Sequence, residues 1–327
     1  MADVITALSL GAPLAGAGGC DHVTSADDAL HVIDAPTPEG GGLDAAPSDA
    51  DVLDAMPIDA GRIDAGPLDA FRAPRSSGHA SFTPPGPNEP RYAVHDETIE
   101  DEITGLVWER FASTDLLTLE DAHARCEALS LEAHDDFRVP SRVELVSLLR
   151  TTRSPTIDPI FEGTEAEYHW SSSLHPIRDA SATTVYFGAA EIVFALAADR
   201  SAVVRCVRGG RGEGAGPARE AGRVVDRGTR LVWDVLDTQR TYAEAVRGCE
   251  ALALRMPTLD ELASVVDDAR SMPAIDLEVL GGEAGPTWSS SAAQTSGERI
   301  GLDLAAGPSV RLRESERAWA RCVTEAP

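Results

Sequence analysis

The chain contains an internal repeat, and this repeat limits the folds that the sequence can adopt more than any other feature. Five short motifs occur twice in the same order. In the first copy they are residues 104–108, Cys126, residues 138–141, residues 170–173 and residues 205–207. In the second copy they are residues 229–233, Cys249, residues 255–258, residues 288–291 and residues 321–323. The distance between the copies is longer than the period of a solenoid, so the sequence predicts two copies of one globular domain.

The repeat also sets the expected domain boundaries. We expect the first domain at residues 91–210 and a shorter, more degenerate second domain at residues 222–327, joined by a Gly- and Arg-rich linker at residues 211–221. Each copy is long enough to bury a hydrophobic core. We therefore expect each copy to fold on its own.

Each copy begins with a strand pattern, at residues 103–111 and 223–235, and continues with two capped helices. The helix-start signals, a Ser or Thr followed three residues later by an acid, occur at Thr118, Ser141, Thr241 and Thr258. Short strand patterns then follow at residues 168–174, 183–187, 192–196 and 202–207, and at residues 287–291, 299–304, 309–312 and 319–323. This order is typical of an α+β domain with an antiparallel sheet.

The cysteines follow the repeat. Cys126 and Cys249 lie on the apolar faces of the predicted first helices, and Cys206 and Cys322 lie in the last predicted strands. We predict the disulfides Cys126–Cys206 and Cys249–Cys322, each stabilising its domain by about 4–5 kcal/mol in the chain-entropy model. A metal site is not expected, because the chain has no Cys-x-x-Cys motif and the second copy has no His.

Residues 1–20 are apolar and rich in small side chains, and they end in Ala-Gly-Gly-Cys20. This pattern resembles a secretory signal with a degenerate bacterial lipobox, in which Cys20 is the lipidated residue. We expect an exported protein of the cell envelope whose contact with the membrane is a lipid anchor on Cys20. The alternative is a signal peptide without lipidation.

Residues 21–90 form an Asp-, Ala- and Pro-rich segment. Residues 21–70 contain 12 acids and one Arg, and Asp-Ala pairs recur every five residues from Asp44 to Asp69. A segment with this much like charge and so few large apolar side chains does not form a core. The sequence predicts a disordered acidic stalk.

The charge of the chain excludes some partners. The formal net charge is −26, and both repeats are acidic, with 21 acids and 10 Arg in residues 92–210 and 17 acids and 12 Arg in residues 221–327. Binding to nucleic acid needs a cationic surface, as does direct attraction to an anionic membrane. We therefore expect neither.

The motifs resemble the Lcl C-terminal domain family. The resemblance depends on Thr-Gly-Leu-x-Trp, the Cys in the first helix, Arg-x-Pro-Ser/Thr-x-x-Glu-Leu, Trp-Ser-Ser and the closing Arg-Cys-Val. It implies a C-type-lectin-like fold, distantly related to formylglycine-generating enzymes, in an exported bacterial protein. Two positions depart from the family pattern: Phe137 stands where Trp is usual, and Arg230 replaces the motif glycine. An adhesin of the family is thought to bind sulfated glycans, but the acidic charge here argues against that ligand.

Several residues are predicted to be structural. Trp108, Trp170, Trp233 and Trp288 are expected in the core, with an exposed platform for sugar stacking as the alternative. Arg138 and Arg255 are also expected in the core. Together with Arg205 and Arg321, they are predicted to form inner salt bridges with Asp158 and Asp276.

The sequence favours a binding function over catalysis. The histidines of the first copy, His123, His134, His169 and His175, do not accompany a nucleophile motif, and no cofactor is expected. We expect a binding or adhesion module for a glycan or a protein; the ligand and the oligomeric state stay open. The alternatives are a structural envelope protein without a soluble ligand, and an enzyme related to formylglycine-generating enzymes.

Overall fold

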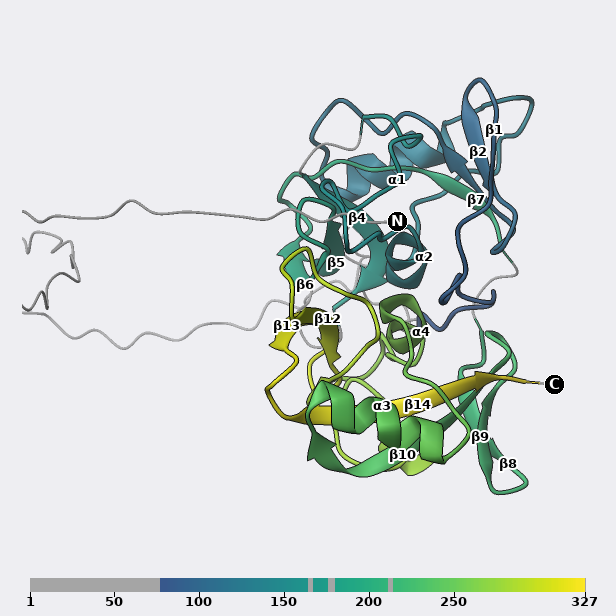
Figure 1. The fold of residues 1–327 in the computed structure, drawn as a ribbon. Coiled ribbons are helices and arrows are strands. Elements are labelled where there is room, and N and C mark those ends of the chain that lie inside the picture. Colours follow the sequence, from purple (N-terminus) through teal and green to yellow (C-terminus); the bar gives the residue numbers. More distant parts are fainter. Residues whose placement is uncertain (1–76, 164–166, 176–179, 211–213, 327) are drawn as a thin grey trace, which may run out of the picture. The chain divides into compact units, whose positions relative to one another are not determined.

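The computed structural model describes residues 77–163, 167–175, 180–210 and 214–326 (Figure 1). All of these residues belong to one compact unit, residues 62–327. Cys20, the predicted signal segment and most of the predicted stalk lie outside the described residues. Within the described ranges, no helix has the length and apolar character needed to cross a bilayer.

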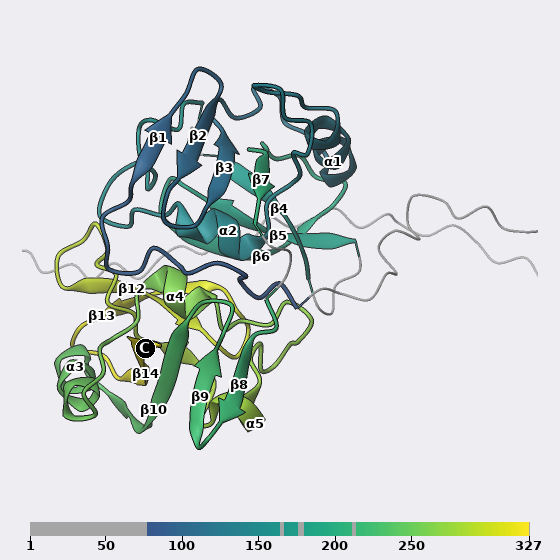
Figure 2. The same cartoon turned by 90° about the vertical axis from the view of Figure 1, so that its right-hand side faces the viewer.

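The described part of the first repeat has two antiparallel sheets and two helices (Figure 2). One sheet has the order β1-β2-β3-β7 and the other the order β4-β5-β6. The strands are Tyr92–Val94 (β1), Thr98–Asp101 (β2), Leu106–Glu109 (β3), Tyr168–Leu174 (β4), Ser181–Tyr186 (β5), Glu191–Ala197 (β6) and Val207–Gly209 (β7), and the helices are Leu119–Glu127 (α1) and Arg142–Ser147 (α2). Ile99, Trp108 and Val207 are cross-strand neighbours on one fully buried face of the first sheet.

The described part of the second repeat has one seven-stranded sheet with the order β13-β12-β11-β14-β10-β9-β8. Its strands are Pro217–Glu220 (β8), Arg223–Asp226 (β9), Leu231–Arg240 (β10), Pro286–Thr287 (β11), Glu298–Asp303 (β12), Ser309–Arg313 (β13) and Ala318–Glu325 (β14), and its helices are Tyr242–Ala251 (α3), Leu259–Ala263 (α4) and Leu277–Leu280 (α5). The sheet is antiparallel except between β11 and β14, where Thr287 pairs with Trp319 in parallel. The α+β class is therefore as expected, with one parallel pair that the sequence does not indicate.

The four predicted helix starts are the N-caps of α1, α2, α3 and α4. In α2, the Ser141 N–H donates to Glu144 Oε2 at 2.7 Å, and the Glu144 N–H donates to Ser141 Oγ at 3.4 Å. In α4, the Thr258 N–H donates to Glu261 Oε2 at 2.9 Å. These bonds satisfy N–H groups that have no partner inside the helix.

The strands differ from the expectation at several places. The predicted strand at residues 223–235 is two strands, because the chain turns at Arg230, whose φ is +62°. In the predicted strand at residues 202–207, only Val207 belongs to β7. The predicted linker at residues 211–221 contains β8, an edge strand of the large sheet. Strands β1, β2 and β8 and helix α5, each of three or four residues, are too short to show a hydrophobic period.

Residues 77–90, the end of the predicted stalk, are folded against the repeats, and we call them the N-terminal strap. Ala80 and Phe82 are buried. His79 Nδ1 lies 3.2 Å from the Ser264 carbonyl oxygen, and the Gly86 N–H donates to Asp260 Oδ2 at 2.8 Å. The prediction of disorder is wrong for these residues, because they have apolar side chains to bury and backbone partners in the second repeat.

Buried apolar side chains of the described residues form three clusters. Trp170 and the first disulfide belong to a cluster of the first repeat, and Trp288 and the second disulfide belong to its counterpart in the second repeat. Trp108 and Trp233 belong to the third and largest cluster, which contains side chains of both repeats. The repeats therefore keep separate sheets but share a core, contrary to the expectation that each folds on its own.

A buried ion pair crosses between the repeats. Arg142 Nε donates to Asp268 Oδ1 at 2.8 Å, and the guanidinium also donates to the carbonyls of Ala263 and Val266. The two side chains are 0% and 3% exposed. Helices α2 and α4 lie side by side at this point (Figures 1 and 2). Since a buried guanidinium needs these acceptors, helix α2 depends on the second repeat.

Candidate functional site

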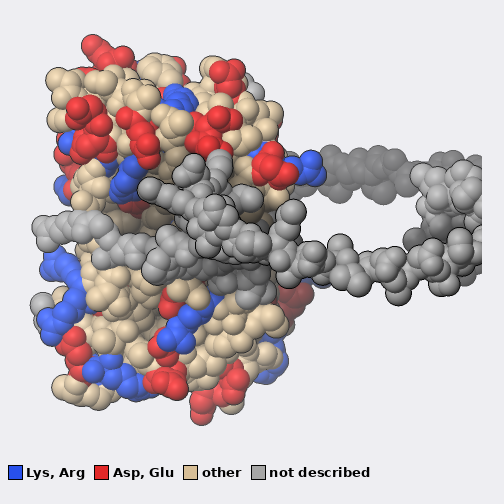
Figure 3. Space-filling view, turned by 180° about the vertical axis from the view of Figure 1, so that it is seen from behind, with Lys and Arg blue, Asp and Glu red and all other residues tan. Residues whose placement is uncertain are grey.

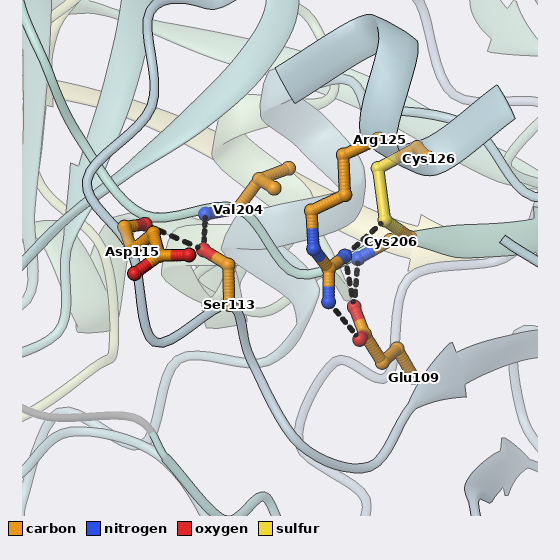
Figure 4. Close-up of a disulfide and its surroundings, with 7 residues drawn as sticks. All are labelled: Glu109, Ser113, Asp115, Arg125, Cys126, Val204 and Cys206. Carbon is orange, nitrogen blue, oxygen red and sulfur yellow. Dashed lines mark hydrogen bonds and ion pairs between the residues drawn. A yellow bond between two sulfur atoms is a disulfide. The ribbon is translucent and has the colours of Figure 1, made fainter. Parts of the chain in front are cut away.

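A cleft of about 460 Å³ opens in the first repeat near the Cys126–Cys206 disulfide. Figure 4 shows the disulfide and the side chains around it. The lining residues of the cleft come from the end of β3, the loop that leads to α1, and α1 itself: Glu109, Phe111, Ala112, Ser113, Thr114, Asp115, Leu117 and Arg125. The disulfide fixes the distance between α1 and the chain entering β7, because Cys126 lies in α1 and Cys206 directly precedes β7. These two elements position the charged groups of the cleft.

An ion pair between Arg125 and Glu109 lies against the disulfide. Arg125 Nη1 donates to Glu109 Oε2 at 3.0 Å and to Cys206 Sγ at 3.0 Å, and Nη2 donates to Glu109 Oε1. The Cys206 N–H also donates to Glu109 Oε2, at 3.1 Å. The Glu109 side chain is 7% exposed and the Arg125 side chain 28%, so the guanidinium is the part of the pair that a ligand reaches more easily.

Apolar side chains stand at the rim of this cleft. Phe111 is 46% exposed and Leu116, next to the lining residue Asp115, is 57% exposed. The Arg110 guanidinium lies 5.2 Å from the centre of the Phe111 ring. Ser113 holds the loop in place, because its hydroxyl accepts from the Val204 N–H at 2.9 Å and donates to the Asp115 carbonyl at 3.1 Å (Figure 4). The cleft combines an exposed aromatic ring with an ionic floor.

In the described part of the second repeat, the positions that match this cleft are filled by an apolar side chain. Aligning Trp108 with Trp233 and Cys126 with Cys249 places Leu236 at the position of Phe111 and Gly248 at that of Arg125. Leu236 is 7% exposed and fills the space above Gly248, where an added Cβ would come within 2.6 Å of Leu236 Cδ1. The second disulfide therefore contacts apolar atoms, among them Met256 Sδ at 3.5 Å from Cys249 Sγ.

The structure contains both predicted disulfides, Cys126–Cys206 and Cys249–Cys322. It also buries the four repeated tryptophans, Trp108, Trp170, Trp233 and Trp288, with exposures of 0–3%. Trp170 Nε1 donates to the Leu117 carbonyl and Trp288 Nε1 to the Arg240 carbonyl. Burial leaves these rings unable to stack on a sugar, so the alternative of an exposed platform is wrong for all four.

The predicted inner salt bridges are wrong. Arg205 donates to the carbonyls of Glu109, Arg110 and Glu162, and Arg321 donates to those of Leu280 and Gly281. Burial lowers the pKa of Arg205 and of Arg321 to about 10 each. Backbone carbonyls of the neighbouring loops, rather than Asp158 or Asp276, solvate these two guanidinium groups.

Arg138 and Arg255 pair with the cap acids of the following helices. Arg138 Nη2 lies 2.6 Å from Glu144 Oε1, and Arg255 Nη2 lies 2.6 Å from Glu261 Oε1. The carboxylates are buried, but the arginine side chains are 40% and 34% exposed. The prediction that these arginines belong to the core is therefore wrong for their guanidinium groups, which stay at the surface while the paired acids are covered. The predicted partners, Asp158 and Asp276, pair instead with Arg153 and Arg270.

Glu109, Phe111 and Arg125 are not among the residues predicted from the sequence. The repeated motifs contain only positions that the two copies share, and the copies differ at these three positions. A charged residue directly before the helical Cys in one copy, and Gly in the other, is the signal that identifies Arg125.

Comparison with protein families gives two matches within this chain. The model of the Lcl C-terminal domain matches residues 97–208 and residues 222–324, so it covers both repeats. Comparison with curated proteins found no match. In the described ranges, no three His, Cys, Asp or Glu side chains come together in a group that could hold a metal ion.

Proposed function

Because this chain belongs to the Lcl C-terminal domain family, we propose that it is a binding module of the bacterial cell envelope and that its first repeat carries the ligand site. Export, a lipid anchor on Cys20 and a C-type-lectin-like fold for each repeat are parts of this proposal. The two disulfides support export, since such bonds persist in oxidising compartments outside the cytosol.

The exposed Phe111 ring beside the Arg125–Glu109 pair is the observation that carries the proposal. A sugar ring has apolar C–H faces and hydroxyl groups at its edge. An aromatic ring offers a flat apolar surface for the first, and a planar ion pair offers donors and acceptors for the second. The cleft of about 460 Å³ is within the usual size range for small-ligand sites. We therefore propose a glycan as the ligand.

The charge of the first repeat favours an uncharged glycan. Figure 3 shows acidic side chains gathered over the upper part of the molecule, which is the first repeat, and more arginines over the second. The single cation that lines the cleft, Arg125, is already paired with Glu109. A sulfated or carboxylated sugar would be repelled by the net negative charge of the first repeat.

We propose binding rather than catalysis, and no cofactor is part of the proposal. His169 is fully buried, and its ring is perpendicular to that of Phe187, with 4.8 Å between the ring centres. Burial and the nearby Arg205 lower the pKa of His169 to about 3, so the imidazole stays neutral. A buried imidazole with so low a pKa is a weak proton acceptor that a bound substrate does not reach, so we assign His169 to packing rather than to general-base catalysis.

A glycan array probed with the full chain tests the proposal. We expect binding to a set of uncharged glycans, with at least about a tenfold loss of affinity in Phe111→Ala. The matched control is Leu252→Ala in the second repeat, because Leu252 is 45% exposed and Phe111 is 46% exposed. Absence of glycan binding by the folded chain would favour a structural envelope protein. An equal loss in both variants would contradict the assignment of the site.

A further inference from the structure

The first repeat contains a second cavity, of about 360 Å³, between the N-terminal strap and the start of α2. Its walls include Phe82 of the strap, His123 of α1, Val139 and Val143 near the start of α2, and Ser172 of β4. None of its lining residues belongs to the cleft beside the disulfide. The cavity is a separate feature, in which these apolar side chains lie beside serines and the Arg138–Glu144 ion pair.

The strap covers the equivalent surface of the second repeat. Aligning Ser141 with Thr258 places Asp260 at the position of Val143 and Glu261 at that of Glu144. The Gly86 N–H donates to Asp260 Oδ2 at 2.8 Å, and a Cβ on Gly86 would come within 2.8 Å of Glu261 Oε1. Gly86 also has a φ of +60°, which favours glycine. The sequence Pro-Pro-Gly therefore fits this surface at close range.

The equivalent surface of the first repeat lacks the carboxylate that binds the strap on the second repeat. Val143 has no carboxylate, so the N–H acceptor that Asp260 offers to Gly86 is missing. Apolar side chains take its place, because Phe82 and Val143 are buried and Val139 is 1% exposed. Such walls accept the rings of prolines, which have no N–H group to satisfy.

We propose that this cavity binds an extended segment of a partner protein that contains consecutive prolines. On the homologous surface, Gly86 donates to Asp260, and the two residues before it, Pro84 and Pro85, are buried. Proline segments are extended before binding and lose little conformational entropy when they dock in an apolar groove. The peptide site is separate from the proposed glycan cleft, and neither depends on the other.

The strap sequence itself supplies the probe. A fluorescent peptide with the sequence of residues 81–89, Ser-Phe-Thr-Pro-Pro-Gly-Pro-Asn-Glu, is titrated against the full chain and binding is followed by anisotropy. We expect saturable binding that is lost when the three prolines of the peptide are replaced by alanine. His123→Trp fills the cavity from α1 and should weaken binding by at least about tenfold.

The matched control is Val246→Trp, because Val246 is the counterpart of His123 in α3 and is also half-buried. It should leave the affinity for the peptide unchanged. If His123→Trp unfolds the protein, as judged by thermal melting, Ser172→Leu narrows the same cavity from β4. Absence of saturable binding by the folded chain, or binding that survives in the folded cavity-filling variant, would overturn the proposal.

Discussion

The two repeats hold equivalent disulfides in different surroundings. In the first repeat, Arg125 donates to Cys206 Sγ and to the buried carboxylate of Glu109. In the second, Leu236 lies over Gly248, and Met256 contacts Cys249. Both disulfides join the same two places in the repeat, across sequence separations of 80 and 73 residues.

This difference shows which contacts around the disulfide the fold requires. The second repeat shows that apolar contacts suffice to bury the disulfide, so the fold does not require an ion pair there. A buried ion pair often adds little stability over an apolar replacement. The Arg125–Glu109 pair and the exposed Phe111 are therefore features that the fold permits rather than requires, which is the reason to assign them to ligand binding.

Removing each disulfide is expected to have the largest effect. Cys126→Ala/Cys206→Ala and Cys249→Ala/Cys322→Ala should each lower the free energy of unfolding by about 4–5 kcal/mol, because the closed loops are of similar length. Denaturant unfolding of both double variants measures the two losses. The contrary outcome is a larger decrease in the free energy of unfolding for Cys126→Ala/Cys206→Ala than for Cys249→Ala/Cys322→Ala. A difference of more than about 2 kcal/mol would show that the charged groups around the first disulfide stabilise the fold.

Removing the inter-repeat ion pair should have the next largest effect. Arg142→Ala leaves Asp268 buried without its partner, and we expect a loss of about 3–5 kcal/mol. The double variant Arg142→Leu/Asp268→Leu should recover most of this loss, because the counterpart of Arg142 in the second repeat is the buried Leu259. The same denaturant curves should show one transition. Two separate transitions would mean that the shared core does not couple the repeats.

Asp260 should make stability depend on pH, whereas Val143, its counterpart, cannot. Burial and the neighbouring Glu261 raise the pKa of Asp260 from 3.8 to about 6. The folded state then binds more protons than the unfolded state between about pH 4 and pH 6, so this residue lowers the free energy of unfolding as pH rises through that window. Asp260→Asn keeps an acceptor for the Gly86 N–H but does not titrate. Between about pH 4 and pH 6, the free energy of unfolding of this variant should therefore fall by about 1–3 kcal/mol less than that of the parent. Parallel pH profiles of the parent and the variant would contradict the expectation.

Substitutions at Gly105, in the turn before β3, and at its counterpart Arg230, before β10, should have the smallest effect on stability. Gly105 has a φ of +72° and Arg230 a φ of +62°, a conformation that costs a non-glycine residue about 1 kcal/mol. Arg230→Gly should raise the melting temperature by about 2–4 °C, and Gly105→Ala should lower it by a similar amount. An added Cβ on Gly105 meets no atom within 4 Å, so a large loss there would point to an effect other than backbone strain.

The parts of this fold that the sequence predicts are those that depend on local groups or on the repeat. Ser141 and Thr258 cap their helices with Glu144 and Glu261, three residues away in the same turn. The disulfides follow from one pair of cysteines in each copy. In both cases, the sequence itself contains all the partners.

The parts that the sequence does not predict depend on backbone direction or on contact between the repeats. Arg205 is solvated by three carbonyls, and a sequence does not show where a carbonyl points. Arg142 has partners more than 120 residues away, in the other repeat. The cleft is missed for a different reason: Phe111 and Arg125 lie where the copies differ, and the motifs record only where they agree.

The N-terminal strap has a mechanical consequence. Residues 77–86 precede the first repeat in the chain, but Ser77, His79 and Gly86 form hydrogen bonds to Asp268, Ser264 and Asp260 of the second. Tension applied to the polypeptide before residue 77 would therefore act on the second repeat first. It would act on the first repeat only after these hydrogen bonds had broken. The cleft lined by Phe111 would then be deformed later than the second repeat.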